Sequence, residues 1–158
     1  MPEKAELDRT DRRIIRALQQ NGRMTNLDLS AAVNLSPSPC LRRLKALEQN
    51  DVIQGYSAQV DPRRYGLPVT VFVRIRLELH SRESVLRFEE SVRSIPEILE
   101  CHLMTGLSDY LLRVLVSDLE DYERFVRTRL HPIGGISSID SSFVYGVVKR
   151  THVFPDIE

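Results

Sequence analysis

The stretch SPSPCLRRLKAL, Ser36 to Leu47, decides how the first part of this chain folds. Two prolines stand directly before a segment whose leucines recur at helical spacing. Proline is tolerated in the first turn of a helix, because the N–H groups there have no intrahelical partner. With Ser36 as the N-cap, Pro37 takes the first helical position and Pro39 the third. The sequence therefore predicts that the prolines begin a helix, which runs to about Gln49.

This predicted helix has two unlike faces. At about 100° per residue, the apolar face consists of Leu41, Leu44 and Leu47, with Cys40 beside it. The opposite face carries side chains of the types that read base edges in DNA, namely Ser38, Arg42, Lys45 and Gln49. On an isolated helix, the same residues would be typical of an ordinary solvated surface.

Two shorter helices are predicted before it. Apolar residues recur at helical spacing between Asp8 and Gln20, and Thr25 is the expected N-cap of the next helix, with Asp28 in the capping-box position. A short turn then leads to the proline-initiated helix. This is the helix-turn-helix layout, at about residues 26–45, whose second helix enters the DNA major groove. Ser38, Arg42 and Lys45 are expected to contact bases, and Arg43 and the helix N-termini to contact phosphates. The full set of expected DNA-binding residues is Thr25, Asn26, Ser36, Ser38, Pro39, Arg42, Arg43 and Lys45.

The rest of the chain predicts a different fold. Residues 52–68 are interpreted as a strand, able to form a small wing or to pair with another chain, followed by a linker. Strands are then expected from the patterns VTVFVRIRLE, EILECHLM, DYLLRVLVS and ISSIDSSFVYGVVKR, with helices at 81–95 and 118–130. The order β-α-β-β-α-β is that of a ferredoxin-like fold. The predicted class is α+β, with a three-helix, winged-helix-like domain at 1–67 and a ferredoxin-like domain at 68–158.

Composition adds an uneven charge distribution. The net charge is zero, but residues 1–65 carry 11 Lys and Arg against 8 Asp and Glu, and residues 66–158 carry 11 against 14. The basic half is therefore the predicted DNA-binding half. The charged N-terminus and the absence of a long apolar run predict a cytoplasmic protein with no membrane partner. The two cysteines, Cys40 and Cys101, are expected to be unpaired thiols.

The segment TGLSDYLL between two predicted strands is a candidate ligand loop. Gly106 permits a tight turn with exposed backbone groups. Asp109, Thr105, Ser108 and the backbone offer the acceptors and donors that the ammonium and carboxylate of an amino acid require. A plain β-turn would also account for Gly106 and Asp109.

Two motifs together resemble one family. LDRTDRRIIRALQQNGRMTNLDLSAAVNLS followed by SPSPCLRRLKALEQNDVIQGY is similar to the DNA-binding domain of the Lrp/AsnC family, and ECHLMTGLSDYLLRV is similar to its effector-sensing region. The resemblance implies a bacterial or archaeal transcription regulator that binds double-stranded DNA, dimerises through its C-terminal domain and often forms octamers. It also implies an amino-acid effector between neighbouring dimers, at Met104, Thr105, Gly106, Leu107, Ser108, Asp109 and Tyr110. The loop PIGGISS departs from the family's Pro-Gly-Val pattern.

Two alternatives remain at this point. Sirohaem decarboxylases resemble Lrp-type proteins in both domains, so an enzyme of that type shares the expected fold. An effector-sensing oligomer that binds no DNA is the other. The four histidines do not cluster with the cysteines at zinc-ligand spacing, and no phosphate loop or nucleophile motif is present. We therefore expect a regulator that is not an enzyme and carries no metal or cofactor.

Overall fold

The computed structural model describes residues 7–156 and divides the chain into two compact units. The first unit consists of Met1–Gln59 with Val148–Glu158, and the second of Val60–Val147. Each unit has its own hydrophobic core. No helix among residues 7–156 is both long and apolar enough to cross a membrane.

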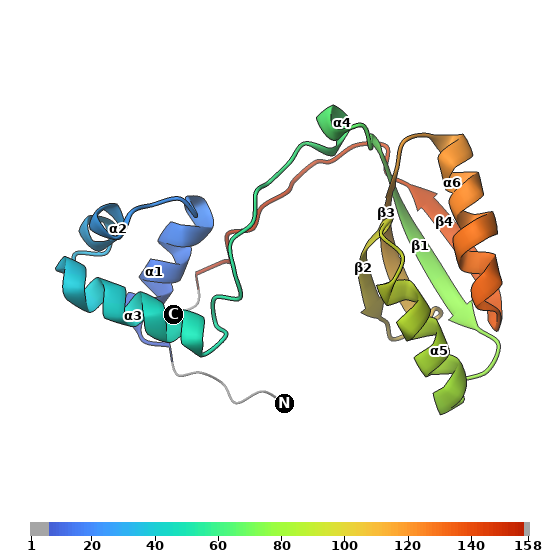
Figure 1. Ribbon diagram of the computed structural model, residues 1–158, viewed down its shortest axis with the longest axis horizontal. Helices are drawn as coiled ribbons and strands as arrows, with labels where there is room; N and C mark the ends of the chain where they lie inside the picture. The colour runs from blue at the N-terminus through green and yellow to red at the C-terminus, as the bar shows by residue number, and fades with distance from the viewer. Residues whose placement is uncertain (1–6, 157–158) are drawn as a thin grey trace. The chain divides into compact units, whose positions relative to one another are not determined.

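The described part of the first unit contains three helices (Figure 1), which pack around a small core. They are α1 (Arg9–Gln20), α2 (Asn26–Ala32) and α3 (Pro37–Gln49). A complete capping box between Asp8 and Asp11 begins α1, and the Thr25 hydroxyl accepts the backbone N–H of Asp28 to begin α2. The buried core residues come from all three helices and their connections: Ile14, Leu29, Val33, Cys40 and Leu47.

The start of α3 has the predicted form, with one difference. Ser36 is the N-cap, with extended φ and ψ angles of −75° and 154°, and the prolines lie in the first turn. The Ser36 side chain makes no capping hydrogen bond. Pro39 explains this in part, because the third helical residue normally donates its N–H to the cap and proline has none. Asn34, at φ 57°, makes the tight turn that precedes Ser36.

Two expectations for this unit were wrong. Leu41 was placed in the apolar stripe of α3, but its side chain is 39% exposed, and Cys40 and Leu47 are the buried residues of that helix. The segment after α3 forms no strand. Tyr56 instead folds back and donates a hydrogen bond of 2.9 Å to Glu48 on α3. A strand needs a neighbour for its backbone groups, and the four-stranded sheet recorded for residues 7–156 lies in the second unit.

The second unit begins with the short helix α4 (Pro62–Tyr65) and continues as a ferredoxin-like fold (Figure 1). Its elements are β1 (Val69–Leu77), α5 (Arg82–Arg93), β2 (Ile98–Leu103), β3 (Tyr110–Val116), α6 (Leu119–Phe125) and β4 (Ile136–Phe143). A π-helical turn (Val126–Leu130) and a short 3₁₀ turn (His131–Ile133) extend α6. The sheet is antiparallel with strand order β2-β3-β1-β4. The predicted fold class is therefore confirmed.

One face of this sheet is covered by both long helices. Alternate residues of β1 and β3 are buried there against Phe88 and Val92 of α5 and Phe125 of α6. The opposite face is open within the described chain. Half-buried apolar side chains of Phe72, Leu111 and Leu115 lie on it, because their strand partners share their face.

The described C-terminal residues belong with the first unit, whereas the sequence analysis assigned all of residues 68–158 to the second domain. The backbone N–H of Phe154 donates a hydrogen bond of 3.1 Å to Oε1 of Gln19 on α1. Asp156 forms an ion pair of 3.0 Å with Arg16. Such polar tail contacts have no periodic sequence signal, so the sequence does not predict that this segment returns to α1.

Candidate DNA-binding face and effector loop

The polar face of α3 is exposed along its whole length. Ser38, Arg42, Lys45 and Gln49 are all accessible to solvent. Within residues 7–156, neither Arg42 nor Lys45 forms an ion pair with an acidic side chain. Two cationic side chains on one helical face are therefore free to bind an anionic partner such as a DNA backbone or a guanine edge.

Arg43 has different partners from those expected. Its guanidinium Nη1 lies 2.7 Å from Oδ2 of Asp8 and 2.9 Å from Oδ1 of Asp11, both at the start of α1. The backbone N–H of Asp11 and the Arg43 guanidinium lower the pKa of the Asp8 carboxyl. Arg43 thus joins α3 to α1, and its charge is already compensated inside the domain. We therefore do not include Arg43 among the residues proposed to contact phosphates.

Asn26 also has a role inside the domain. Its side-chain Nδ2 donates a hydrogen bond of 3.0 Å to the backbone carbonyl of Pro37, so the first turn of α2 is tied to the first turn of α3. Its Oδ1 atom is buried without a hydrogen-bond partner among the residues described. Of the other expected contacts at the helix starts, Thr25 and Ser36 are exposed and Pro39 is half-buried.

The β2–β3 loop contains the expected effector residues. Gly106 has φ of 110°, a conformation that glycine adopts without strain. Met104, Thr105 and Leu107 are exposed, and the Leu107 side chain is 94% accessible. Among residues 7–156, no hydrogen bond to a protein acceptor is found for the backbone N–H groups of residues 105–108. These backbone donors have no acceptor within the described residues, and a carboxylate is a ligand group that accepts from such donors.

Asp109 is fully engaged at the end of this loop. Its Oδ2 accepts the backbone N–H of Leu77 at 2.7 Å, and its Oδ1 lies 2.8 Å from Nε2 of His80. The Leu77 N–H, followed by His80, lowers the pKa of the Asp109 carboxyl. The sequence suggested Asp109 as an acceptor for a ligand ammonium, whereas in the structure this carboxylate holds the loop against β1.

Tyr110, the last of the expected effector residues, is buried beneath the loop. Its side chain is 2% exposed and its ring packs against Phe88, with 4.6 Å between the ring centroids. Burial and the neighbouring Glu89 raise the pKa of Tyr110 to about 12. The physical reason is the alternation of strand residues, since Tyr110 is the first residue of β3 that points to the helix-covered face.

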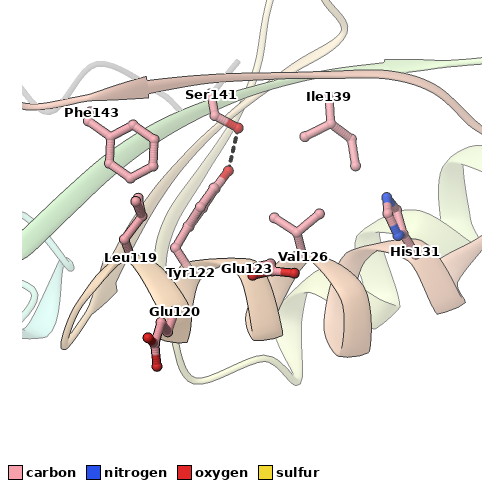
Figure 2. A pocket seen from close by; sticks show the side chains of 9 residues that line it. All are labelled: Leu119, Glu120, Tyr122, Glu123, Val126, His131, Ile139, Ser141 and Phe143. Carbon is pink, nitrogen blue, oxygen red and sulfur yellow. Dashed lines mark hydrogen bonds between the residues drawn. The ribbon is translucent and has the colours of Figure 1, made fainter.

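A groove that sequence reasoning missed runs between α6 and the edge strand β4 (Figure 2). It has a volume of about 520 Å³ and is lined by Leu119, Glu120, Tyr122, Glu123, Val126, His131, Ile139, Ser141 and Phe143. The hydroxyl groups of Tyr122 and Ser141 are hydrogen-bonded across it. The sequence pattern placed Tyr122 and Val126 simply on the inner face of a helix. None of the expected effector residues lines this groove.

Comparisons with known proteins match both units. Residues 7–54 match the winged helix-turn-helix DNA-binding domain, and residues 70–154 match the Lrp/AsnC ligand binding domain. The Bkd operon transcriptional regulator of Pseudomonas aeruginosa is 43% identical over 88% of this chain and 91% of its own length. The leucine-responsive regulatory protein of Haemophilus influenzae is 38% identical over 92% of this chain and 88% of its own.

Solved structures agree with these matches. A transcriptional regulator of Neisseria meningitidis in complex with L-methionine superposes with a TM-score of 0.90 at 40% identity, over 94% of this chain and 96% of the other. An AsnC family transcriptional regulator from Agrobacterium tumefaciens gives 0.89 at 40% identity, over 94% and 97%. All of these relatives are named as regulators, which favours the regulator over the sirohaem-decarboxylase alternative. The chain belongs to the Lrp/AsnC family of transcription regulators, with a DNA-binding domain followed by a ligand-binding domain.

Proposed function

We propose that this regulator recognises specific double-stranded DNA sequences through α3. Ser38, Arg42 and Lys45 contact base edges in the major groove, and the starts of α2 and α3 at Thr25 and Ser36 lie against phosphates. The observation that carries this proposal is the contrast between two consecutive arginines. Arg43 is neutralised by Asp8 and Asp11, whereas Arg42 forms no ion pair within residues 7–156.

The proposed effector is an amino acid that binds at the β2–β3 loop. Support comes from the unused N–H groups of residues 105–108 and from the exposed apolar side chains of Met104 and Leu107. The donors suit a carboxylate, and the apolar side chains suit an aliphatic or thioether side chain. The similar regulator of Neisseria meningitidis was solved with L-methionine, which makes methionine the first amino acid to test.

The proposed assembly is a cytoplasmic homodimer formed by the open sheet faces, which builds larger rings such as octamers. On that face Arg113 pairs with Glu100, with 2.8 Å between Nε and Oε1, and Arg74 lies 3.4 Å from Asp140. These pairs satisfy charges around the half-buried Phe72, Leu111 and Leu115. An apolar centre with a polar surround is typical of a surface covered by a second copy. A dimer also supplies two recognition helices for two DNA half-sites.

An electrophoretic mobility shift assay tests the DNA part of the proposal. The probe is the DNA upstream of the gene for this protein, with a shuffled sequence of equal length as the reference, at a fixed salt concentration. We expect Arg42→Ala to lower specific affinity by about 1–3 kcal/mol. The matched control is Arg64→Ala, since Arg64 is an exposed arginine of the second unit. Equal binding to both DNA sequences by the wild type would contradict the proposal.

A further inference from the structure

His80 makes a contact with the effector loop that the sequence pattern does not predict. It follows β1, and its Nε2 lies 2.8 Å from Oδ1 of Asp109, 29 residues further along the chain. An ionised carboxylate only accepts hydrogen bonds, so Nε2 of His80 must carry the proton and donate it. The His80 side chain is 63% exposed, and the contact ties the β1–α5 connection to the β2–β3 loop.

The other bonds of Asp109 show what His80 adds. The backbone N–H of Asp109 donates to the carbonyl of Ile75, and its own carbonyl accepts the N–H of Met104. With the bond from Leu77 N–H to Oδ2, these contacts fix the position of the Asp109 backbone and one carboxylate oxygen. The second oxygen depends on His80 alone among the side-chain donors of residues 7–156. Loss of His80 should therefore alter the carboxylate without removing the bonds that define the strands.

We propose that His80 is a positioning residue of the effector site, which holds Oδ1 of Asp109 and so keeps the donors of residues 105–108 in their ligand-binding arrangement. The inference rests on the amino-acid site proposed above. In the complex, His80 and Asp109 remain bonded, and the ligand carboxylate contacts the loop N–H groups. Asp109 then acts through the loop rather than as the acceptor of the ligand ammonium.

A competing arrangement predicts the opposite effect. If the ligand ammonium displaced the imidazole from Oδ1 of Asp109, His80 would compete with the ligand. Removal of His80 would then strengthen binding. The sign of the change in affinity therefore separates a positioning residue from a competitor.

The test is isothermal titration calorimetry on the full-length oligomer, with L-methionine first and then each of the other standard amino acids. His80→Ala should weaken binding by about three- to tenfold, the loss that the net contribution of one ordinary hydrogen bond would give, since this bond is solvated and acts on the ligand only through the loop. His80→Gln should remain within about twofold of the wild type, because the glutamine amide can place an N–H donor where Nε2 lies. The control is His152→Ala, which removes another exposed imidazole from the C-terminal segment.

Each outcome has a distinct meaning. Weaker binding in His80→Ala with recovery in His80→Gln supports the inference. Unchanged or tighter binding in His80→Ala, or an equal loss in both variants, overturns it and leaves the proposed amino-acid site in place. If the wild type binds none of the amino acids, both the site and the role of His80 are overturned. Circular dichroism without ligand checks that each variant is folded.

Discussion

Nη1 of Arg43 lies 2.9 Å from Oδ1 of Asp11, so an ion pair joins the proposed recognition helix to the first helix of the domain. The next residue back along α3, Arg42, forms no such pair within residues 7–156 and lies on the exposed face. Adjacent arginines of the same helix thus have separate tasks. One fixes the orientation of the helix, and the other is available for DNA.

Arg43→Ala should reduce stability more than it reduces DNA recognition. The variant leaves Asp8 and Asp11 without their cation, so we expect the thermal midpoint of the DNA-binding unit to fall by a few degrees. The affinity of the folded variant for specific DNA should fall by less than about threefold, because the buried residues Ile14, Cys40 and Leu47 still hold α3 against α1. Thermal denaturation followed by circular dichroism, together with gel shifts at 10 °C below the wild-type midpoint or colder, measures both quantities. A loss of affinity as large as that of Arg42→Ala would return Arg43 to the DNA interface.

Ser36→Ala should cost less than a normal N-cap substitution. The Ser36 side chain makes no capping hydrogen bond, and Pro39 offers no N–H at the third helical position. We expect a loss below about 0.5 kcal/mol, against about 1 kcal/mol for a bonded cap. In a Pro39→Ala background the N–H is restored, and Ser36→Ala should then cost about 1 kcal/mol. Urea denaturation of the four proteins completes this double-mutant cycle, and equal costs in both backgrounds would refute the explanation.

Tyr110→Phe should leave effector affinity unchanged. The Tyr110 hydroxyl donates to Oε1 of Glu89 at 3.1 Å beneath the sheet, away from the loop surface. We expect a loss of about 0.5–1.5 kcal/mol in stability, the usual net contribution of a hydrogen bond. Chemical denaturation measures this loss, and calorimetry with the effector of the wild type measures affinity. A marked loss of affinity at wild-type stability would place Tyr110 in the ligand site after all.

Asp109 should make the stability of the second unit sensitive to acid. The Leu77 N–H and His80 lower the pKa of Asp109 in the folded state, so its carboxylate binds protons less readily than in the unfolded chain. The resulting stabilisation is complete above the unfolded pKa of about 4 and is lost as the pH falls through the folded value. Asp109→Asn should therefore lower stability at pH 7 and show a smaller further loss below about pH 4. Denaturation at a series of pH values measures this slope, with Glu90→Gln as a control of equal charge change at an exposed position. An unaltered slope in Asp109→Asn would contradict the assignment.

Leu111→Glu should prevent assembly through the open sheet face. Leu111 is half-buried on that face and lies opposite Arg74 in the β1–β3 register. A carboxylate here would have to be desolvated beneath a second copy, which costs far more than the leucine it replaces. Size-exclusion chromatography with light scattering should show a monomer. An oligomer of wild-type mass would place the interface elsewhere.

The sequence predicted the fold because its elements follow strict periodicities. Val71, Val73 and Ile75 alternate along β1, and the capping residue Thr25 begins α2 as expected. The exposed row on α3 also followed from helical spacing. The failures lie where tertiary contacts override local pattern. Tyr56 donates a hydrogen bond to Glu48 instead of joining a strand.

For the candidate effector site, the sequence predicted the region of the chain but not the contacts within it. Periodicity locates the loop around Gly106, but no local rule reveals that Asp109 is bonded to Leu77 and His80, which come from a separate part of the chain. The engagement of Asn26 with Pro37 and of Arg43 with Asp11 is likewise a contact between helices. Residue type and spacing therefore select candidates, and only the folded contacts show which of them are already occupied.

The most direct test of the account compares wild type, Arg42→Ala and Arg43→Ala for binding to specific and shuffled DNA in one gel-shift series at fixed salt. We predict that Arg42→Ala loses about 1–3 kcal/mol on the specific DNA and much less on the shuffled DNA. Folded Arg43→Ala should keep the wild-type preference for the specific sequence. If Arg42→Ala instead kept the wild-type ratio of affinities for the specific and shuffled DNA, the result would contradict α3 as the element that reads the operator.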